Sequence, residues 1–284
     1  MPHDPTRPYW MSPSYRCSLL RDAWRCLRLM ARPGDSGLGR LELLREAYRR
    51  VRQWWRNDIQ IHHLTKRMAL WEAFRDRPPR VVVEVGSYDG SDSAELSRMF
   101  PDAQVYAFEA DPANYLKLVR TAAVRPHVRA RPEAVFDFTG RGTFHPSRSV
   151  TGEETGRASG SLLAPTDDLM RAYPHLVFDT GVTVPTVSLA DWAAQEGLDR
   201  IDLIWMDAQG AELHILRGAG VLLPTVRAVI AEVWVRNPYE DGGTFSELRD
   251  FLTVHGFVLT HTWMWDTTGD ALFERPTPSS PGNS

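Results

Sequence analysis

The apolar run Val81–Val85, interrupted only by Glu84, constrains the fold of this chain more than any other feature. A run of β-branched residues without polar alternation predicts a strand that is buried on both faces, as in a parallel sheet covered by helices on each side. Two glycines, Gly86 and Gly90, follow at once, and helical periodicity begins at Ser91, the predicted N-cap. A strand, a glycine turn and a helix in this order predict a doubly wound α/β sheet.

The same alternation continues along most of the chain. Further strands are expected over Gln104–Phe108, Val128–Phe136, Gly142–His145, Val182–Val187, Ile201–Met206 and Val226–Val235, and a terminal hairpin over Phe257–Trp263 and Ala271–Glu274. Helices are expected over Ser91–Phe100, Ala113–Ala123, Leu189–Glu196, Ala211–Ala219 and Thr244–His255. This order predicts a mostly parallel sheet with the hairpin at its edge. Right-handed crossovers then place the functional loops at the carboxyl ends of the strands.

One polar segment, Pro146–Ala172, is too long for an idle connection. We expect it to be an active-site loop or lid in which Ser159 and Ser161 close over an acceptor.

Charge divides the chain near residue 80. Residues 1–80 hold 17 Lys and Arg against 8 Asp and Glu, whereas the remaining residues hold 16 against 28. We therefore expect a tail and helical cap over 1–79, a core domain over 80–275 and a disordered tail over 276–284. Helices are predicted over Ser14–Arg32, Leu41–Trp55 and His62–Phe74. The first has an arginine stripe that suits solvent, with docking to a membrane surface or a partner as the alternative.

Composition and cysteine placement exclude several classes of protein. No apolar run reaches the roughly 18 residues of a transmembrane helix. Two cysteines are too few for a disulfide scaffold or a cysteine-rich zinc module. Cys17 and Cys26 fall on opposite sides of a helix and cannot pair there, so a reducing, cytoplasmic location is expected. A net charge of −3 is not typical of a general nucleic-acid binder.

An acidic loop with two glycines closes the first strand, over Glu84–Gly90. We expect Gly86 to allow a sharp turn and Gly90 to let a ligand approach the backbone. The spacing Gly-x-x-x-Gly differs from the Gly-x-Gly-x-x-Gly that places a pyrophosphate on a helix N-terminus. Because Glu84 repels anions and attracts cations, the loop favours a zwitterionic nucleoside with an amino group over NAD.

Four more carboxylates follow or interrupt strands. Glu109 ends the second strand, where it can accept hydrogen bonds from both ribose hydroxyls. Asp207 sits where the fourth parallel strand meets the crevice, and Glu212 lies in the next helical turn, where it offsets the helix dipole. Glu232 interrupts an apolar strand. A lone buried carboxylate is destabilising by several kcal/mol, so we expect Glu232 at the crevice or paired with an arginine.

Together these motifs resemble the FkbM family of S-adenosylmethionine-dependent methyltransferases over about residues 80–275. The resemblance is carried by Glu84-x-Gly86-x-x-x-Gly90, Phe108-Glu109-x-Asp111-Pro112, Ser159-Gly160-Ser161-Leu162, Val184-Pro185-Thr186-Val187-Ser188-Leu189 and, most specifically, Asp207-x-x-Gly210-Ala211-Glu212-x-x-x-Leu216-x-Gly218-Ala219. The chain departs from it at Ser87-Tyr88-Asp89, where members commonly carry Ala-Asn-x, and at Gln209, where Glu is common. The resemblance implies a class I methyltransferase fold, with seven strands and an antiparallel last strand.

The resemblance also implies roles for individual residues. Glu84 and Gly86 would line the methionine part of the cofactor, with Gly90 nearby, Glu109 would hold the ribose, and Glu133 and Ala134 would flank the adenine. Ser87 and Ala110 are further candidate cofactor contacts, and Asp207 would face the methyl group and the acceptor. The candidate bases are Asp207, Glu212 and His214, although His214 is expected to face outward. Asp207 and Glu232 end neighbouring strands. Carboxylates in comparable places hold Mg²⁺ in metal-dependent O-methyltransferases, and a metal-free site is the competing expectation.

The expected function is therefore methyl transfer from S-adenosylmethionine to a hydroxyl of a sugar, glycan or glycosylated secondary metabolite. Five aromatic residues expected near the crevice would suit sugar rings or polyketide surfaces: Trp205, Trp234, Tyr239, Trp263 and Trp265. The alternatives are a non-catalytic, partner-binding relative and an NAD-dependent oxidoreductase. A nucleic-acid methyltransferase would need an Asn/Asp-Pro-Pro-Tyr-type loop after the fourth strand, which this chain lacks, so no nucleic-acid partner is expected. The N-terminal helices would cap the cleft or form a homodimer interface.

Overall fold

The computed structural model describes residues 59–150 and 154–276. The helices predicted over Ser14–Arg32 and Leu41–Trp55, with their cysteines and arginine stripe, lie outside these residues, as does the tail from residue 277. The chain divides into two units, Met1–Asp76 and Arg77–Ser284. In the first unit the described residues form one helix, α3 (Ile59–Phe74), which includes the predicted His62–Phe74.

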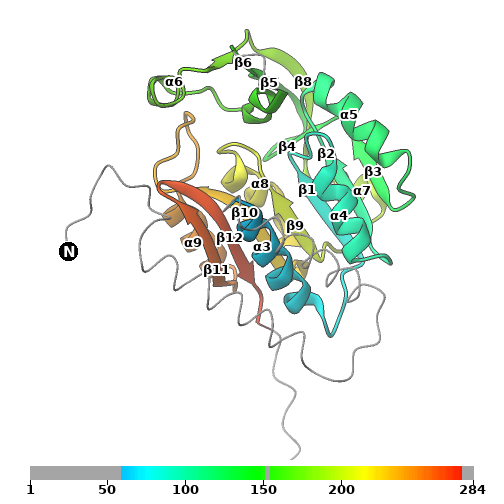
Figure 1. Cartoon of the computed structure of the whole chain (residues 1–284). Helices are drawn as coiled ribbons and strands as arrows, with labels where there is room; N and C mark the ends of the chain where they lie inside the picture. The colour runs from blue at the N-terminus through cyan, green and yellow to red at the C-terminus, as the bar shows by residue number, and fades with distance from the viewer. Residues whose placement is uncertain (1–58, 151–153, 277–284) are drawn as a thin grey trace, which may run out of the picture. The chain divides into compact units, whose positions relative to one another are not determined.

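The second unit is built on a seven-stranded sheet (Figure 1). Its strands follow the order β11-β12-β10-β9-β1-β2-β3, and β12 runs antiparallel to both of its neighbours. The bounds are β1 (Val81–Val85), β2 (Gln104–Phe108), β3 (Val128–Arg131), β9 (Leu203–Met206), β10 (Ala228–Trp234), β11 (Val258–Trp265) and β12 (Thr268–Glu274). The predicted mostly parallel sheet with a terminal hairpin at its edge is confirmed.

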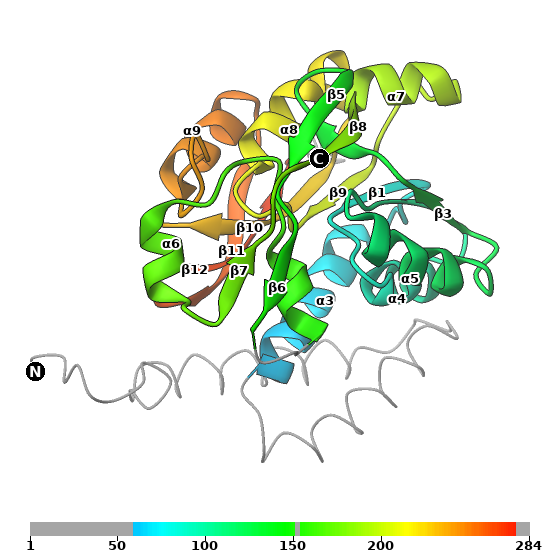
Figure 2. The same ribbon diagram turned by 90° about the horizontal axis from the view of Figure 1, so that it is seen from above.

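Helices cover both faces of this sheet. Figure 2 shows α4 (Ser91–Met99) and α5 (Pro112–Ala122) on one face and α7 (Leu189–Glu196), α8 (Glu212–Gly218) and α9 (Phe245–Val254) on the other. A short 3₁₀ helix, η3 (Gly220–Thr225), follows α8. All five residues of β1 are consequently buried, as a strand enclosed by helices on both faces requires.

The core between the sheet and α7 is organised around one aromatic side chain. Trp192 of α7 meets Tyr106 and Phe108 of β2 edge to face, with ring centroids 4.7 and 5.2 Å apart. These three side chains belong to the main hydrophobic cluster. Their packing fixes the carboxyl end of β2, which carries Glu109.

An insertion between β3 and α7 forms two further small sheets. It contains β4 (Ala134–Phe136), β5 (Gly140–Phe144), β6 (Ser147–Ser149), η2 (Glu154–Ser159), α6 (Asp167–Ala172), β7 (Leu176–Phe178) and β8 (Val182–Ser188). One small sheet has the order β4-β8-β5, and the other pairs β6 with β7. In Figure 1 the insertion gathers at one end of the main sheet.

The structure corrects three predictions about these elements. The single strand expected over Val128–Phe136 is two strands in different sheets, divided by Pro132, which has no N–H to donate. The segment Pro146–Ala172, expected to be a loop, contains β6, η2 and α6. The N-cap of α4 is Gly90, in a left-handed conformation, and Ser91 is the first helical residue.

Candidate active site

A cavity lies where the adjacent strands β9, β1 and β2 end, and the insertion forms its other wall. It brings together six predicted cofactor residues: Gly86, Glu109, Ala110, Glu133, Ala134 and Asp207. The other predicted site residues lie outside its lining: Glu84, Ser87, Gly90, Glu212, His214 and Glu232. The carboxyl ends of parallel strands are where ligands bind in open α/β sheets, so the cavity lies where the topology places a site.

Glu109 is fixed in the cavity wall by backbone donors. Its Oε2 accepts the N–H of Tyr88 at 2.7 Å, and its Oε1 accepts the N–H of Asp111 at 2.7 Å. Burial raises the pKa of Glu109 to about 7, although the two N–H donors oppose the shift. Each carboxylate oxygen can accept more than one hydrogen bond, so Glu109 can also receive hydroxyl donors from a ligand.

Gly86 is required by the close approach of two strand ends. Its φ is +82°, and a Cβ there would lie 1.9 Å from the backbone oxygen of Asp207. The predicted sharp turn is thus confirmed. Gly90 also has positive φ, at +78°, but a Cβ there would meet Leu118 Cδ1 at 2.7 Å. The lack of a side chain at Gly90 therefore allows α4 to pack closely on α5, and the predicted approach of a ligand to its backbone stays a prediction.

Glu84 is directed toward α4. It is 2% exposed, and its Oε2 accepts a hydrogen bond from the hydroxyl of Ser93. The hydroxyl of Ser87 donates to the backbone oxygen of Glu84 at 3.4 Å. Burial, with Asp92 and Glu109 nearby, raises the pKa of Glu84 well above its usual value. The predicted contacts of Glu84, Ser87 and Gly90 with the cofactor stay predictions.

Asp207, at the end of β9, is exposed on the cavity wall. Its Oδ1 accepts a hydrogen bond from Gln209 Nε2 at 2.7 Å. The same nitrogen donates to Glu232 Oε2 at 2.9 Å. Trp234 Nε1 also donates to Glu232 Oε2, at 3.2 Å. Glu232 is therefore held by an amide and an indole outside the cavity lining, in place of the expected position at the crevice or beside an arginine.

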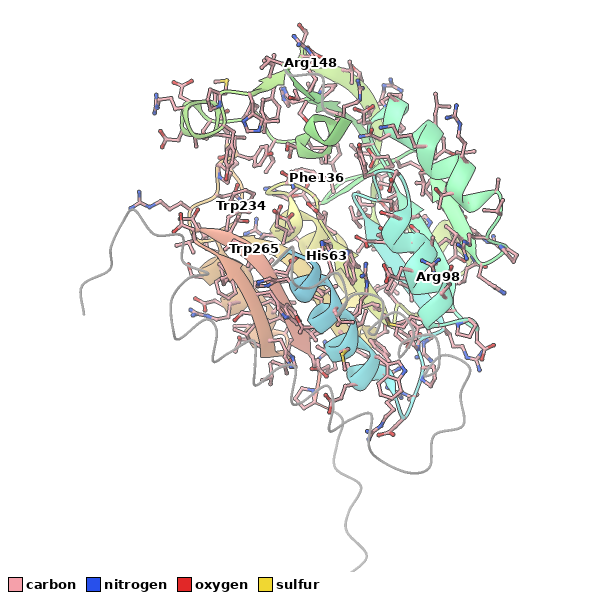
Figure 3. The ribbon with its side chains drawn as sticks, viewed as in Figure 1. His63, Arg98, Phe136, Arg148, Trp234 and Trp265 are labelled. Atoms are coloured by element: carbon pink, nitrogen blue, oxygen red, sulfur yellow. The ribbon has the colours of Figure 1, made fainter. Side chains whose placement is uncertain are left out.

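The other two candidate bases lie on α8, outside the cavity lining. Glu212 is 3% exposed and accepts the N–H of Ala208 at 2.9 Å, and burial raises its pKa to about 7. His214 Nδ1 lies 2.7 Å from Asp137 Oδ2, and its ring stacks on Phe136 with centroids 4.5 Å apart. Figure 3 marks Phe136, on β4 beside α8. Of the three candidates, only Asp207 lines the cavity.

A family model described as the methyltransferase FkbM domain matches residues 84–259. The chain belongs to the FkbM methyltransferase family. This confirms the predicted family and the methyltransferase class. It also agrees with the sheet described above, which has the seven strands and the antiparallel last strand expected for the class I methyltransferase fold.

Two curated relatives are members with named reactions. The 2-O-methyltransferase NoeI of Sinorhizobium fredii is 32% identical over 197 residues, covering 69% of this chain and 80% of its own length. The 31-O-demethyl-FK506 methyltransferase FkbM of Streptomyces tacrolimicus is 30% identical over 214 residues, covering 69% and 79%. Among solved structures, magnesium protoporphyrin IX methyltransferase from Synechocystis PCC 6803 is 12% identical with a TM-score of 0.41 and covers 91% of this chain and 96% of its own, a likeness too slight to add to the assignment.

The predicted Mg²⁺ site does not fit this FkbM-family chain. No group of three or more His, Cys, Asp or Glu side chains able to hold a metal occurs within 59–150 and 154–276. The space between the two proposed ligands, Asp207 and Glu232, is taken by the N–H₂ group of Gln209. Mg²⁺ requires oxygen ligands, whereas this N–H₂ group presents hydrogen-bond donors to the same space.

Three polar residues of the cavity were not predicted from the sequence: Tyr88, Asn114 and Arg157. Asp111, the N-cap of α5, accepts the N–H of Ala113 at 2.7 Å and also pairs with Arg157 Nη2 at 3.1 Å. Asn114 Nδ2 donates to the backbone oxygen of Arg157 at 3.0 Å. The insertion is thereby tied to α5 over the cavity. Asn114 follows the motif Asp111-Pro112 and was within reach of sequence reasoning, whereas Arg157 enters only through the fold of the insertion.

Two acceptor atoms in the wall lack a partner among the described residues. They are Asn114 Oδ1, on a side chain that is 2% exposed, and Glu133 Oε2. Buried polar atoms are nearly always hydrogen-bonded in native proteins, so these two indicate a ligand that carries N–H or O–H donors.

The five aromatic residues predicted to face the crevice do not line the cavity. Trp205, Trp234, Tyr239 and Trp263 are buried, and Trp265 is half-buried. Figure 3 marks Trp234 and Trp265 at the ends of β10 and β11. Their burial outside the cavity lining indicates that they pack within the fold.

No helix among the described residues is both long and apolar enough to cross a membrane.

Proposed function

We propose that this protein is an S-adenosylmethionine-dependent O-methyltransferase that acts on a hydroxyl of a sugar, a glycan or a glycosylated secondary metabolite. Membership of the FkbM family supports methyl transfer. The names of the two relatives, a 2-O-methyltransferase and a 31-O-demethyl-FK506 methyltransferase, support an oxygen as acceptor. The observation that carries the proposal is the cavity in which Glu109 and Asp207 follow the two strands that flank β1.

The nucleoside would bind at the end of β2. Glu109, whose orientation is fixed by Tyr88 and Asp111, would accept both ribose hydroxyls. Glu133 and Ala134 would flank the adenine, and the unpartnered Asn114 Oδ1 and Glu133 Oε2 would be acceptors for its amino group. These residues fit S-adenosylmethionine, which carries hydroxyl and amino donors and a positive charge.

The reacting atoms would lie between Gly86 and Asp207. S-adenosylmethionine would supply a methyl group on a positively charged sulfur, which is a good leaving group. Gly86 would leave room for the methionine part. Asp207, as the only candidate base on the cavity wall, would take the proton that the acceptor hydroxyl loses. The main tasks of the chain would then be alignment of the acceptor, exclusion of water and removal of this proton.

Calorimetry with S-adenosylhomocysteine tests the cofactor assignment. We expect one site per chain for this probe and no binding of NADH. Failure to bind S-adenosylhomocysteine would remove the proposal and favour a non-catalytic relative, and binding of NADH would revive the oxidoreductase alternative.

The variant Asp207→Ala tests the role of the proposed base. We expect it to bind S-adenosylhomocysteine within about three-fold of the wild-type affinity and to lose about 10²–10⁴-fold in turnover, the usual contribution of a general base. The measurement is transfer of labelled methyl groups to a panel of hydroxylated glycosides. Normal turnover by Asp207→Ala would contradict the role.

A further inference from the structure

The side chain of Gln209 joins the acidic groups at the carboxyl ends of β9 and β10. Its Nε2 donates to Asp207 Oδ1 at 2.7 Å and to Glu232 Oε2 at 2.9 Å. Its Oε1 lies 2.9 Å from the hydroxyl of Tyr239. The contact with Asp207 indicates which end of the amide is nitrogen, because the flipped amide would set its oxygen against a carboxylate oxygen of Asp207.

Tyr239 is placed to keep this orientation. Its side chain is 3% exposed, and its hydroxyl lies 2.9 Å from both Gln209 Oε1 and the backbone oxygen of Ser159. Both neighbours are acceptors, so the hydroxyl serves as a donor. Burial, with Glu232 and Asp207 nearby, raises the pKa of Tyr239 well above its usual value, which keeps that donor protonated.

The backbone of Gln209 is strained into its place. Its φ is +52°, a left-handed conformation that is unfavourable by roughly 1–2 kcal/mol for a residue other than glycine. Its backbone oxygen accepts the hydroxyl of Ser161 at 2.8 Å, so the insertion holds the strained residue. Backbone strain that is held in place by several contacts is typical of functional positions, which indicates a functional role for Gln209.

We propose that Gln209 is the positioning residue for Asp207. Its carboxamide, oriented by Tyr239, holds the Asp207 carboxylate at the cavity. The same carboxamide occupies the space between Asp207 and Glu232, where a divalent cation would otherwise bind. The proposal rests on the proposed function, because it takes Asp207 as the group that receives the acceptor proton. It also makes that proton transfer independent of a metal ion, since the amide supplies the donors that hold the two acidic groups together.

Two substitutions test the role of the Gln209 side-chain amide without disturbing the backbone conformation. Gln209→Gly removes the side chain and suits the positive φ, so the fold should be kept. Gln209→Glu keeps the shape but replaces the N–H₂ donors with a third carboxylate. A matched control is Gln195→Glu, which adds the same charge on the exposed surface of α7.

The first measurement is calorimetry with MnCl₂ and needs no acceptor. We expect no stoichiometric Mn²⁺ binding by the wild type or by Gln195→Glu, and at least ten-fold tighter binding by Gln209→Glu, which would offer three carboxylates where the amide now lies. Stoichiometric Mn²⁺ binding by the wild type, or no difference between Gln209→Glu and Gln195→Glu, would overturn the proposal.

The second measurement separates kcat from cofactor binding. We expect Gln209→Gly to reduce kcat by about 10–100-fold, the scale of a misplaced catalytic group, with the Kd for S-adenosylhomocysteine unchanged within about three-fold. Tyr239→Phe should reduce kcat less, because the amide remains. Wild-type kcat that is insensitive to EDTA supports the proposal. A normal kcat in Gln209→Gly overturns it, while the proposed function would fail separately if the wild type did not bind S-adenosylhomocysteine.

Discussion

The two ends of strand β9 carry aspartates in opposite surroundings. Asp202, just before the strand, is fully buried, and its Oδ2 accepts the backbone N–H groups of Arg80 and Val81 at 2.8 and 3.1 Å. Its Oδ1 pairs with Arg200 and lies 3.8 Å from Arg227. Asp207, just after the strand, is exposed on the cavity wall and is held by the neutral amide of Gln209.

This difference extends beyond the two aspartates. At the carboxyl ends of the strands, Glu109, Glu212 and Glu232 accept hydrogen bonds from backbone, amide and indole groups, all of them uncharged. Burial raises the pKa of each of the three. Among the described residues, the arginine-paired Asp202 therefore serves structure, whereas the glutamates held by uncharged donors keep raised pKa values that suit contact with a ligand or a proton.

The largest expected effect is on the free energy of unfolding of two alanine variants, one for each aspartate. We expect Asp202→Ala to lower the free energy of unfolding by about 3–5 kcal/mol, because it leaves buried N–H groups and an arginine without their acceptor. Asp207→Ala should change it by less than about 0.5 kcal/mol, as for an exposed residue. Urea denaturation measures both. Equal losses would show that the two ends of β9 are not specialised in this way.

The sequence predicted several elements of the main sheet and its helices most reliably. The bounds of β1, β2 and α7 match the expected ranges, because a short apolar strand and a helical repeat are local signals. The placement of Glu109 and Asp207 followed from topology, since the carboxyl ends of parallel strands share one edge of the sheet.

What the sequence did not predict depends on contacts between distant segments. Strand β6 reads Ser-Arg-Ser and pairs with β7 about thirty residues later, so no local apolar pattern marks it. Arg157 joins the cavity only because the insertion folds back onto Asp111. Asp202 is followed by a strand but was not singled out, because its arginine and backbone partners come together only in the fold. The amide between Asp207 and Glu232 was missed for the same reason.

A smaller effect is expected from pH at Glu109. Its pKa of about 7 in the ligand-free protein means that it is mostly protonated at pH 6 and mostly ionised at pH 8. If the ionised form accepts the ribose hydroxyls, S-adenosylhomocysteine should bind about ten-fold more tightly at pH 8 than at pH 6. The stability of the ligand-free protein should change in the opposite direction. A pKa raised above its unfolded value favours the protonated folded form, so this stability is lost as the pH rises toward 7.

The variant Glu109→Gln is the control for both pH effects. Glutamine cannot titrate in this range, so the part of each pH dependence that Glu109 causes should disappear. Calorimetry at pH 6, 7 and 8 gives the affinity, and thermal melting without ligand gives the stability. A pH dependence of affinity that is the same in the wild type and in Glu109→Gln would assign it to another group.

The smallest expected effect is on stability, and it distinguishes Glu212 from Asp207 at the carboxyl ends of the strands. Burial raises the pKa of Glu212 to about 7, and its Oε1 accepts the N–H of Ala208 at 2.9 Å. Glutamine keeps that acceptor without the charge. The difference in unfolding free energy between Glu212→Gln and the wild type should therefore shift by about 1 kcal/mol in favour of the variant as the pH rises from 6 to 8. The reason is that only the wild type must ionise a buried group over that range. Turnover should stay within about three-fold, since Glu212 lies outside the cavity lining. Loss of turnover comparable to that of Asp207→Ala would make Glu212 the base. It would contradict the assignment of the exposed Asp207 as the reacting carboxylate and of the buried Glu212 as a structural one.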